Sequence, residues 1–141
     1  MGDPETIRLD MPASYGYLDA VSSLIAALLE SVEGLRDPAM LSYNMQLAVH
    51  EACTNIVRHA YGGCSDGRVR ITLILSRQAR RLTVELIDTG RPFDPSAVAA
   101  VDLSQPHEHG YGLFLMHSLL DQVTYDPQPG RNRWLLVKDL R

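Results

Sequence analysis

Two runs of β-branched and aliphatic residues, separated by a short polar connection, constrain the fold of this chain more than any other feature. VRITLIL (69–75) and LTVELID (82–88) flank the segment SRQARR. Runs of this length and composition, joined by a few polar residues, are typical of an antiparallel β-hairpin. We therefore predict a sheet built around residues 69–88, which the other elements must cover.

Two helices are predicted before this hairpin. The apolar residues of segment 15–33 recur at helical spacing, and Gly34 follows as a natural stop. Asp37 then precedes Pro38, which places a good cap residue before a proline at the first helical position. The second helix should run from there to about Tyr61.

The rest of the chain predicts a second helix-and-strand region after a long connection. Residues 89–109 are rich in proline and polar residues, and we expect a helix over 112–123 and a last strand at 134–138. TIRLD (6–10) alternates weakly and is expected as a short edge strand. This order predicts an α+β fold of one domain, residues 1–141, with helices packed on one face of a mixed, mostly antiparallel sheet.

Composition excludes several classes of function. The formal net charge is −4, and the chain contains no run of Lys or Arg, so direct binding of nucleic acid is not expected. No apolar stretch approaches the roughly 18 residues of a membrane span, and we expect a cytoplasmic protein with no membrane partner. The two cysteines and five histidines do not fall into zinc-binding spacing.

The segment EACTNIVRHAY (51–61) of the second predicted helix carries four polar residues on one side. At about 100° per residue, Glu51, Asn55, Arg58 and His59 fall within roughly a third of the circumference. They are either the solvent-facing side of an amphipathic helix or a ligand-binding stripe.

Asp88 is the last residue of a predicted strand, and its side chain points to the same face as those of the core residues Leu82, Val84 and Leu86. A carboxylate facing the core needs a partner, because burying it unpaired costs several kcal/mol. Asp88 either caps its own turn or receives a polar ligand, for instance the exocyclic amine of adenine.

Two glycines precede the third predicted helix, in the segment HGYGLFLM (109–116). Gly110 and Gly112 would let the backbone approach a ligand closely, and the free amides of a helix start favour phosphate. The same pattern also fits a helix that simply begins after glycines.

These three pieces occur in one order along the chain, and as a set they resemble a known family. The chain resembles the histidine-kinase-like (GHKL) ATPase domain shared by histidine kinases, gyrase and heat-shock chaperones, whose motifs are Glu-x-x-x-Asn, Asp-x-Gly-x-Gly and Gly-x-Gly. EACTNIVRHAY, DTGRPFDP and GYGLFLMHSLLDQVTY most resemble the small anti-sigma-factor serine kinases of bacteria. The resemblance spans almost the whole chain and implies a two-layer α/β sandwich of the Bergerat type.

The resemblance also implies roles for the helix residues. Asn55 would hold Mg²⁺ through its amide oxygen, since this hard ion prefers oxygen ligands. Glu51 would lie near the γ-phosphate of ATP and accept the proton of an attacking hydroxyl. Arg58 and His59 would continue the nucleotide-facing stripe, with roles that the sequence does not fix.

The remaining motifs would bind the rest of the nucleotide. Asp88 would bind adenine, Gly90 would give the base room, and residues 91–109 would form a lid over the nucleotide. The backbone amides that would surround the phosphates belong to Gly110, Tyr111, Gly112, Leu113 and Phe114.

By this resemblance the protein is expected to be an ATP- and Mg²⁺-dependent protein serine/threonine kinase and anti-sigma factor. It would bind a sigma factor, phosphorylate a small anti-anti-sigma protein of the STAS type, and exchange these partners. Family analogy is also compatible with a homodimer.

The sequence departs from the family pattern at two places. Pro92 replaces the second glycine of Asp-x-Gly-x-Gly, a variant common in this subgroup that stiffens the base of the lid. Kinases of the group commonly carry an arginine near Gly-x-Gly, whereas this chain has His107, Glu108, His109 and Tyr111. A neutral histidine or a glutamate stabilises transition-state charge less than arginine does.

The missing arginine leaves a second function open. Arg58 or Arg91 could replace it, or the protein could be a module that binds ATP or ADP and switches partners without transferring phosphate. The catalytic half of a histidine kinase would need an upstream helical hairpin with an acceptor histidine, and a gyrase-like or chaperone ATPase would need further domains.

Overall fold

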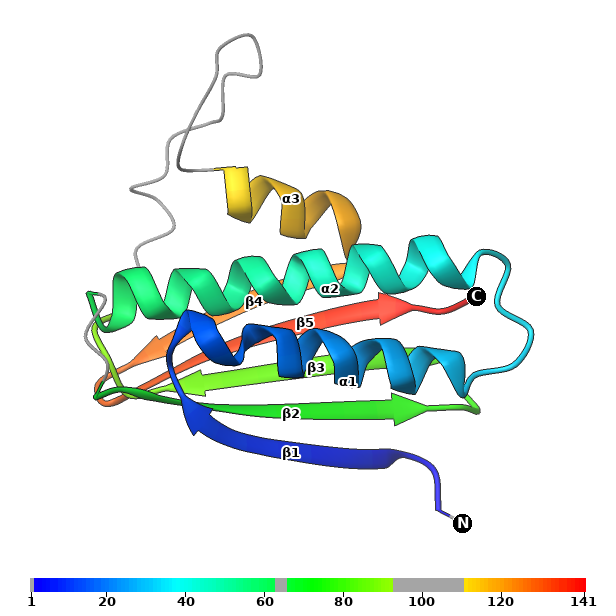
Figure 1. Ribbon diagram of the computed structural model, residues 1–141, viewed down its shortest axis with the longest axis horizontal. Coiled ribbons are helices and arrows are strands. Elements are labelled where there is room, and N and C mark those ends of the chain that lie inside the picture. The colour runs from blue at the N-terminus through cyan, green and yellow to red at the C-terminus, as the bar shows by residue number, and fades with distance from the viewer. Residues whose placement is uncertain (1, 63–65, 93–110) are drawn as a thin grey trace, which may run out of the picture.

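An antiparallel sheet forms one layer of the protein (Figure 1). The computed structural model describes residues 2–62, 66–92 and 111–141, with Tyr111 described by its backbone alone. The sheet has the order β1-β2-β3-β5-β4, and its strands are β1 (Glu5–Pro12), β2 (Arg68–Ser76), β3 (Arg81–Asp88), β4 (Gln122–Gln128) and β5 (Arg131–Asp139). The predicted hairpin is confirmed as β2 and β3, in which Val69 lies opposite Asp88.

Helices form the second layer, on one face of this sheet. They are a short 3₁₀ turn η1 (Tyr15–Tyr17), α1 (Leu18–Glu30), α2 (Pro38–Asn55), a π-helical turn η2 (Ile56–Ala60) and α3 (Tyr111–Leu119). Figure 1 shows α1 and α2 side by side across the sheet, and α2 contacts both α1 and α3. The predicted fold class is confirmed, and every strand pairing among the described residues is antiparallel.

The start of α2 follows the chemistry expected from its sequence. The Asp37 side chain accepts a hydrogen bond from the Met40 amide at 3.2 Å, and Pro38 occupies the first helical turn, where its missing N–H costs nothing. At the other end, Gly62 adopts a φ of +59°, which side chains rarely allow, and the chain leaves the helix there. The predicted start of this helix is confirmed, and its predicted end near Tyr61 is reached through the π-helical turn η2, since α2 itself ends at Asn55.

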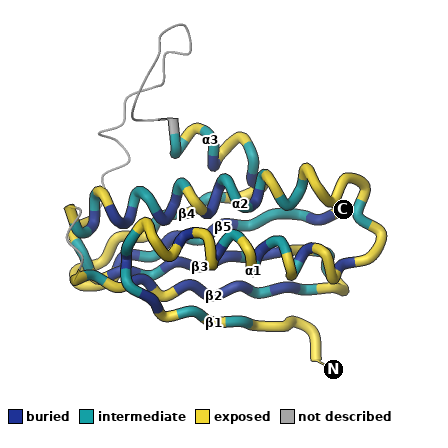
Figure 2. Tube along the Cα trace, viewed as in Figure 1, coloured by how far each residue is buried: buried dark blue, intermediate teal, exposed yellow. Residues whose placement is uncertain are grey.

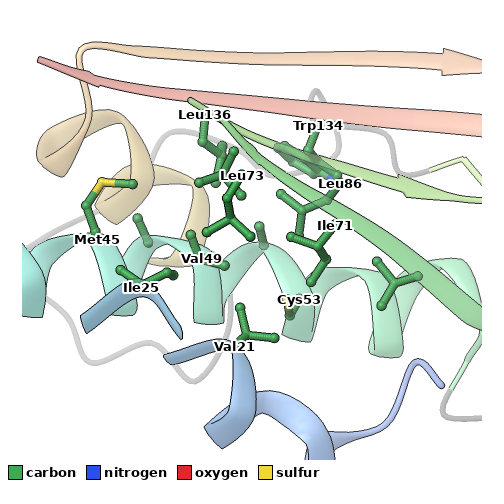
Figure 3. Close-up of a cluster of buried hydrophobic side chains, with 14 of the residues drawn as sticks. Val21, Ile25, Met45, Val49, Cys53, Ile71, Leu73, Leu86, Trp134 and Leu136 are labelled. Atoms are coloured by element: carbon green, nitrogen blue, oxygen red, sulfur yellow. The ribbon is translucent and has the colours of Figure 1, made fainter. Parts of the chain in front are cut away.

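The core lies between the two layers (Figure 3). In β3 and β5 buried residues alternate with half-buried ones, as the colours of Figure 2 show. The buried side chains of the sheet and those of α1 and α2 meet between the layers. Side chains with at most 2 % exposure from both layers meet there: Val21, Ile25, Met45, Val49, Cys53, Ile71, Leu73, Leu86, Trp134 and Leu136. Burial raises the pKa of the Cys53 thiol to about 12.

One predicted element is wrong. The third helix was expected over 112–123, but α3 ends at Leu119, and residues Gln122–Gln128 form the edge strand β4. In this segment the half-buried Val123 and Tyr125 alternate with exposed residues, and pairing with β5 outweighs the helical pattern that precedes it. β4 is an edge strand, which is where a proline such as Pro127 is tolerated.

Two other predictions are not tested by the fold. The lid expected at about 91–109 lies outside the described residues except for Arg91 and Pro92, and the single-domain organisation of residues 1–141 stays a prediction. Among the described residues, no helix is long and apolar enough to cross a membrane.

The two faces of β3 should respond differently to truncation. Leu86 is fully buried between the layers, so Leu86→Ala should lower the free energy of unfolding by about 2–5 kcal/mol through lost burial and a residual cavity. Its neighbour Ile87 lies on the opposite, uncovered face, and Ile87→Ala should cost less than half as much. Urea unfolding of both variants measures the difference, and equal losses would mean that the outer face is also covered.

Candidate functional site

The polar side of α2 places two predicted site residues next to each other. Glu51 and Asn55 lie one helical turn apart and are both half-buried, whereas the apolar residues predicted for the other side, from Met45 to Ala60, are buried. The Glu51 carboxylate lies against α3, because a Cβ placed on Gly112 would be 2.5 Å from Glu51 Oε2. The helix motif and the second glycine of Gly-x-Gly therefore meet in the folded chain.

The start of α3 brings partial positive charge to the place where Glu51 and Gly112 meet. The first amides of a helix have no partner inside the helix, and they carry the positive end of its dipole. In α3 the first turn approaches the Glu51 carboxylate at Gly112, and Leu113 is half-buried while Phe114 is exposed. Gly110 and the side chain of Tyr111 lie outside the described residues, so their predicted roles stay predictions.

At its other end, α2 is joined to the end of β3. The π-helical turn η2 follows Asn55 directly and closes with a bond from the Tyr61 amide to the Ile56 carbonyl at 3.3 Å. The Ala60 carbonyl accepts a bond from the Arg91 amide at 2.8 Å. Gly90 packs so closely against Ala60 that any Cβ there would overlap the Ala60 carbonyl. π-helical turns are frequent at functional sites.

Asp88 is buried beside this junction and is held by Asn132. The two residues lie opposite each other in the β3–β5 register, and both are at most 2 % exposed. Asp88 Oδ1 accepts bonds from Asn132 Nδ2 at 2.8 Å and from the Gly90 amide at 3.0 Å. Asn132 Nδ2 also donates to the Gly90 carbonyl at 2.9 Å, while Asn132 Oδ1 is buried with no partner among the described residues.

Burial sets the protonation of this carboxyl group. Removal from water disfavours the charged form and raises the pKa of Asp88, while the bonds from Asn132 and Gly90 act in the opposite direction. A buried carboxyl group that keeps an acceptor oxygen is suited to bind a hydrogen-bond donor of a ligand. Perturbed carboxyl groups of this kind are typical of functional sites.

Tyr61 connects the end of the helical layer to the strands around Asp88. Its hydroxyl donates to the Arg68 carbonyl at 2.6 Å and accepts from the Thr89 amide at 3.0 Å. A Cβ on Gly67 would overlap the Tyr61 ring, so the ring lies flush against the backbone. Tyr61 therefore fixes the turn that follows Asp88.

The site thus has two ends along one helix. Glu51 lies at the end where α3 begins, and Ala60 lies at the end where Gly90 and Asp88 meet. Nine residues of helix separate them, which corresponds to about 13 Å. This separation suits an extended ligand with a hydrogen-bonding base at one end and an anionic group at the other.

Comparison with known proteins agrees with this arrangement. Residues 11–138 match the family model of the histidine kinase-like ATPase domain. The chain belongs to the histidine kinase-like ATPase family.

Within this ATPase family, the relatives at sequence level include serine-protein kinases. The chain is 31 % identical over 127 residues to proteins named serine-protein kinase RsbW from Bacillus cereus and from Bacillus anthracis. The match covers 84 % of this chain and 76 % of each relative. This sequence similarity confirms the resemblance to the anti-sigma-factor serine kinases of the family.

Solved structures share the histidine kinase-like ATPase fold. A crystal structure of the RsbU and RsbW domains of a Mycobacterium tuberculosis protein aligns with a TM-score of 0.68 at 16 % identity, covering 96 % of this chain and 32 % of that chain. A histidine kinase domain of a blue-light activated histidine kinase from Erythrobacter litoralis aligns with a TM-score of 0.58 at 18 % identity, covering 92 % and 61 %. This chain therefore spans about a third of the first protein's solved chain.

Three other predicted residues lie on the π-helical turn or near it. Arg58 is exposed and His59 is half-buried, both on the π-helical turn, and their roles stay predictions. The Arg91 guanidinium lies near Gly62, 3.8 Å from where a Cβ on that glycine would be, and so it belongs to the Asp88 end.

Sequence reasoning missed two residues of the candidate site, Asn132 and Tyr61. Asn132 has the same strand parity as Trp134 and Leu136, so an asparagine at a core-facing position was a signal that could have been found. Tyr61 carried no comparable signal, because its role depends on which backbone groups the fold brings to its hydroxyl.

Asp88 should make stability depend on pH in a defined direction. Because its pKa is raised on folding, the native state holds this proton more tightly than the unfolded state, so Asp88 lowers the free energy of unfolding as pH rises above about 4. Asp88→Asn removes this dependence and can keep both acceptor bonds. Urea unfolding should therefore show the variant gaining stability relative to wild type between acidic and neutral pH, whereas parallel profiles would contradict a raised pKa.

Two glycine substitutions should separate folding from function. Gly90→Ala drives a methyl group into the Ala60 backbone and should cost about 1–3 kcal/mol of unfolding free energy. Gly112→Ala meets only the end of the flexible Glu51 side chain, so it should fold normally while displacing that carboxylate. Chemical unfolding together with nucleotide turnover tests the pair, and normal turnover in Gly112→Ala would mean that the Glu51 contact has no role.

Proposed function

We propose that this protein is an ATP- and Mg²⁺-dependent protein serine/threonine kinase and anti-sigma factor. It binds a sigma factor and phosphorylates a small anti-anti-sigma protein of the STAS type, in the bacterial cytoplasm. The observation that carries the proposal is the contact between the Glu51 carboxylate and Gly112 at the start of α3. Membership of the histidine kinase-like ATPase family and the similarity to serine-protein kinases support it.

Adenine is bound at the Asp88 end in this proposal. Both intramolecular bonds to the Asp88 carboxyl group end on Oδ1, which leaves Oδ2 to accept the exocyclic amine of the base. The close packing of Gly90 on Ala60 keeps side chains out of the space beside the base. A hydrogen bond to a charged group contributes about 1.5–3 kcal/mol, enough to orient the nucleotide.

The phosphates lie at the Glu51 end. The free amides of the first turn of α3 receive phosphate oxygens, as helix N-termini commonly do. Asn55 fits a magnesium site, because its amide oxygen is a hard ligand and lies one turn from Glu51. When bound, the ion neutralises charge on the phosphates.

Glu51 acts as general base. The substrate serine or threonine hydroxyl attacks the γ-phosphorus, its proton passes to the Glu51 carboxylate, and the bond to the β–γ bridging oxygen breaks to release ADP. General-base catalysis of this kind contributes about 10² to 10⁴ in rate. Tyr61 and Asn132 act by holding the Asp88 turn in place.

One observation favours a second candidate, a module that binds ATP or ADP and switches partners without transferring phosphate. Besides the magnesium ion, transfer is favoured by a positively charged side chain near the γ-phosphate, and Arg91, a candidate for this role, lies near Gly62. Gly62 lies beyond the end of the helix that carries Glu51, at the Asp88 end of the candidate site. Residues 107–109, which replace the usual arginine, lie outside the described residues.

Glu51→Gln distinguishes the two functions. The substitution keeps the shape of the side chain and removes the base, so ATP affinity should change little while transfer to the anti-anti-sigma partner falls about 10²- to 10⁴-fold. Transfer of labelled phosphate and equilibrium binding of ATP are the measurements. Asp88→Asn is the matched control and should lose ATP binding.

The outcomes are separable. ATP binding that depends on Asp88, without phosphate transfer in wild type, would establish the non-catalytic module. Unchanged transfer in Glu51→Gln would remove Glu51 as the base.

A further inference from the structure

The face of the sheet opposite the helices carries a trough that meets the candidate nucleotide site only at the turn formed by Tyr61 and Thr89. Two hollows of about 590 and 510 Å³ lie on this face and share Arg70, Ile87 and Arg131 in their linings. Together they extend from Thr6 on β1 to Gly130 beside β5. We call this continuous depression the outer trough.

The linings of the outer trough hold four arginines against three acidic residues, Asp10, Asp66 and Glu85, whereas the chain as a whole is negative. Arg68 pairs with Asp10 at 2.9 Å, and Arg133 pairs with Glu85 at 2.5 Å. Arg70, Arg131 and Arg8 line the hollows, are exposed, and form no ion pair with any described residue.

The floor between these arginines is apolar. Ile87 lies between Arg70 on β2 and Arg133 on β5 in the strand register, and Ile74 lies further along β2. Both isoleucines are half-buried without any helix above them. A ligand that fits this surface must offer negative charge at the rim and apolar groups at the centre.

These features favour an acidic protein segment over other occupants. A second copy packed face to face about a two-fold axis would bring unpaired arginines of both copies together. A nucleic-acid backbone carries charge at every residue, would also meet Asp10 and Glu85, and could not use the isoleucine floor, whereas a protein segment can place carboxylates at the arginines alone.

We propose that the outer trough docks an acidic amphipathic segment of a partner protein. Its carboxylates face Arg8, Arg70 and Arg131, and its apolar side chains cover Ile74 and Ile87. The inference goes beyond the proposed kinase activity and holds whether or not the protein transfers phosphate. Asp88 faces the opposite side of β3 and is not part of this surface, whereas Tyr61 and Thr89 lie at its edge.

A peptide pair tests the proposal. The probe is a short fluorescent helical peptide with glutamates on one side and leucines on the other, and its match carries lysines in place of the glutamates. Wild type should bind the glutamate peptide, more weakly as salt increases, and should not bind the lysine peptide. Fluorescence anisotropy measures both affinities.

Substitution of the trough arginines tests whether the peptide binds in the outer trough. Arg70→Gln/Arg131→Gln should weaken binding of the glutamate peptide at least tenfold, with ATP affinity unchanged. The matched control is Arg36→Gln/Arg141→Gln, which removes two arginines from a hollow formed by other segments and should bind as wild type does. Arg8→Gln/Arg70→Gln serves as a second test variant if the first lowers the unfolding temperature.

Several results would overturn the inference. They are failure of the glutamate peptide to bind wild type, equal binding of the lysine peptide, or full affinity in both trough variants. Competition by duplex DNA at equal potency would indicate a polyanion site. A concentration-dependent dimer, seen by sedimentation and lost in the trough variants, would assign the face to a second copy.

Discussion

The structure depends on the burial of one carboxyl group, Asp88, at the end of the central strand β3. Such a group is stable in the core only if it is hydrogen-bonded, and the antiparallel register with β5 provides Asn132 directly opposite. A shift of one residue between these strands would turn Asn132 to the other face and leave the carboxyl group without this donor. The register between β3 and β5 therefore also decides where Asp88, the group proposed to bind adenine, can be buried.

A single long helix then relates this group to the rest of the site. α2 buries its apolar side on the sheet, which fixes its rotation and directs Glu51 and Asn55 away from the core. The π-helical turn at its end changes the local winding and presents the Ala60 carbonyl to Arg91. Because α3 contacts the same helix, one rigid element sets the spacing between the two ends of the site.

The sequence was sufficient for most of the fold because the decisive signals are local. Strand alternation in 69–88, the Asp37–Pro38 cap and the apolar side of α2 each depend on neighbouring residues, and all three were confirmed. β4 could not be predicted in this way, since its residues form a strand only through pairing with β5. The same limit applies to the site. Glu51, Asn55 and Asp88 were predicted from spacing and family motifs, whereas Asn132 and Tyr61 bond to groups far away in sequence.

The burial of Cys53 has a consequence for the chemistry of the whole domain. Oxidants, alkylating reagents and soft metal ions react with the thiolate, and a pKa of about 12 keeps this group protonated at neutral pH. Its sulfur lies within α2, two residues after Glu51, so any adduct would displace the helix that carries the site from the sheet. Close packing therefore protects Cys53 from oxidation for as long as α2 stays packed on the sheet. Reaction of the Cys53 thiol would show when α2 separates from the sheet.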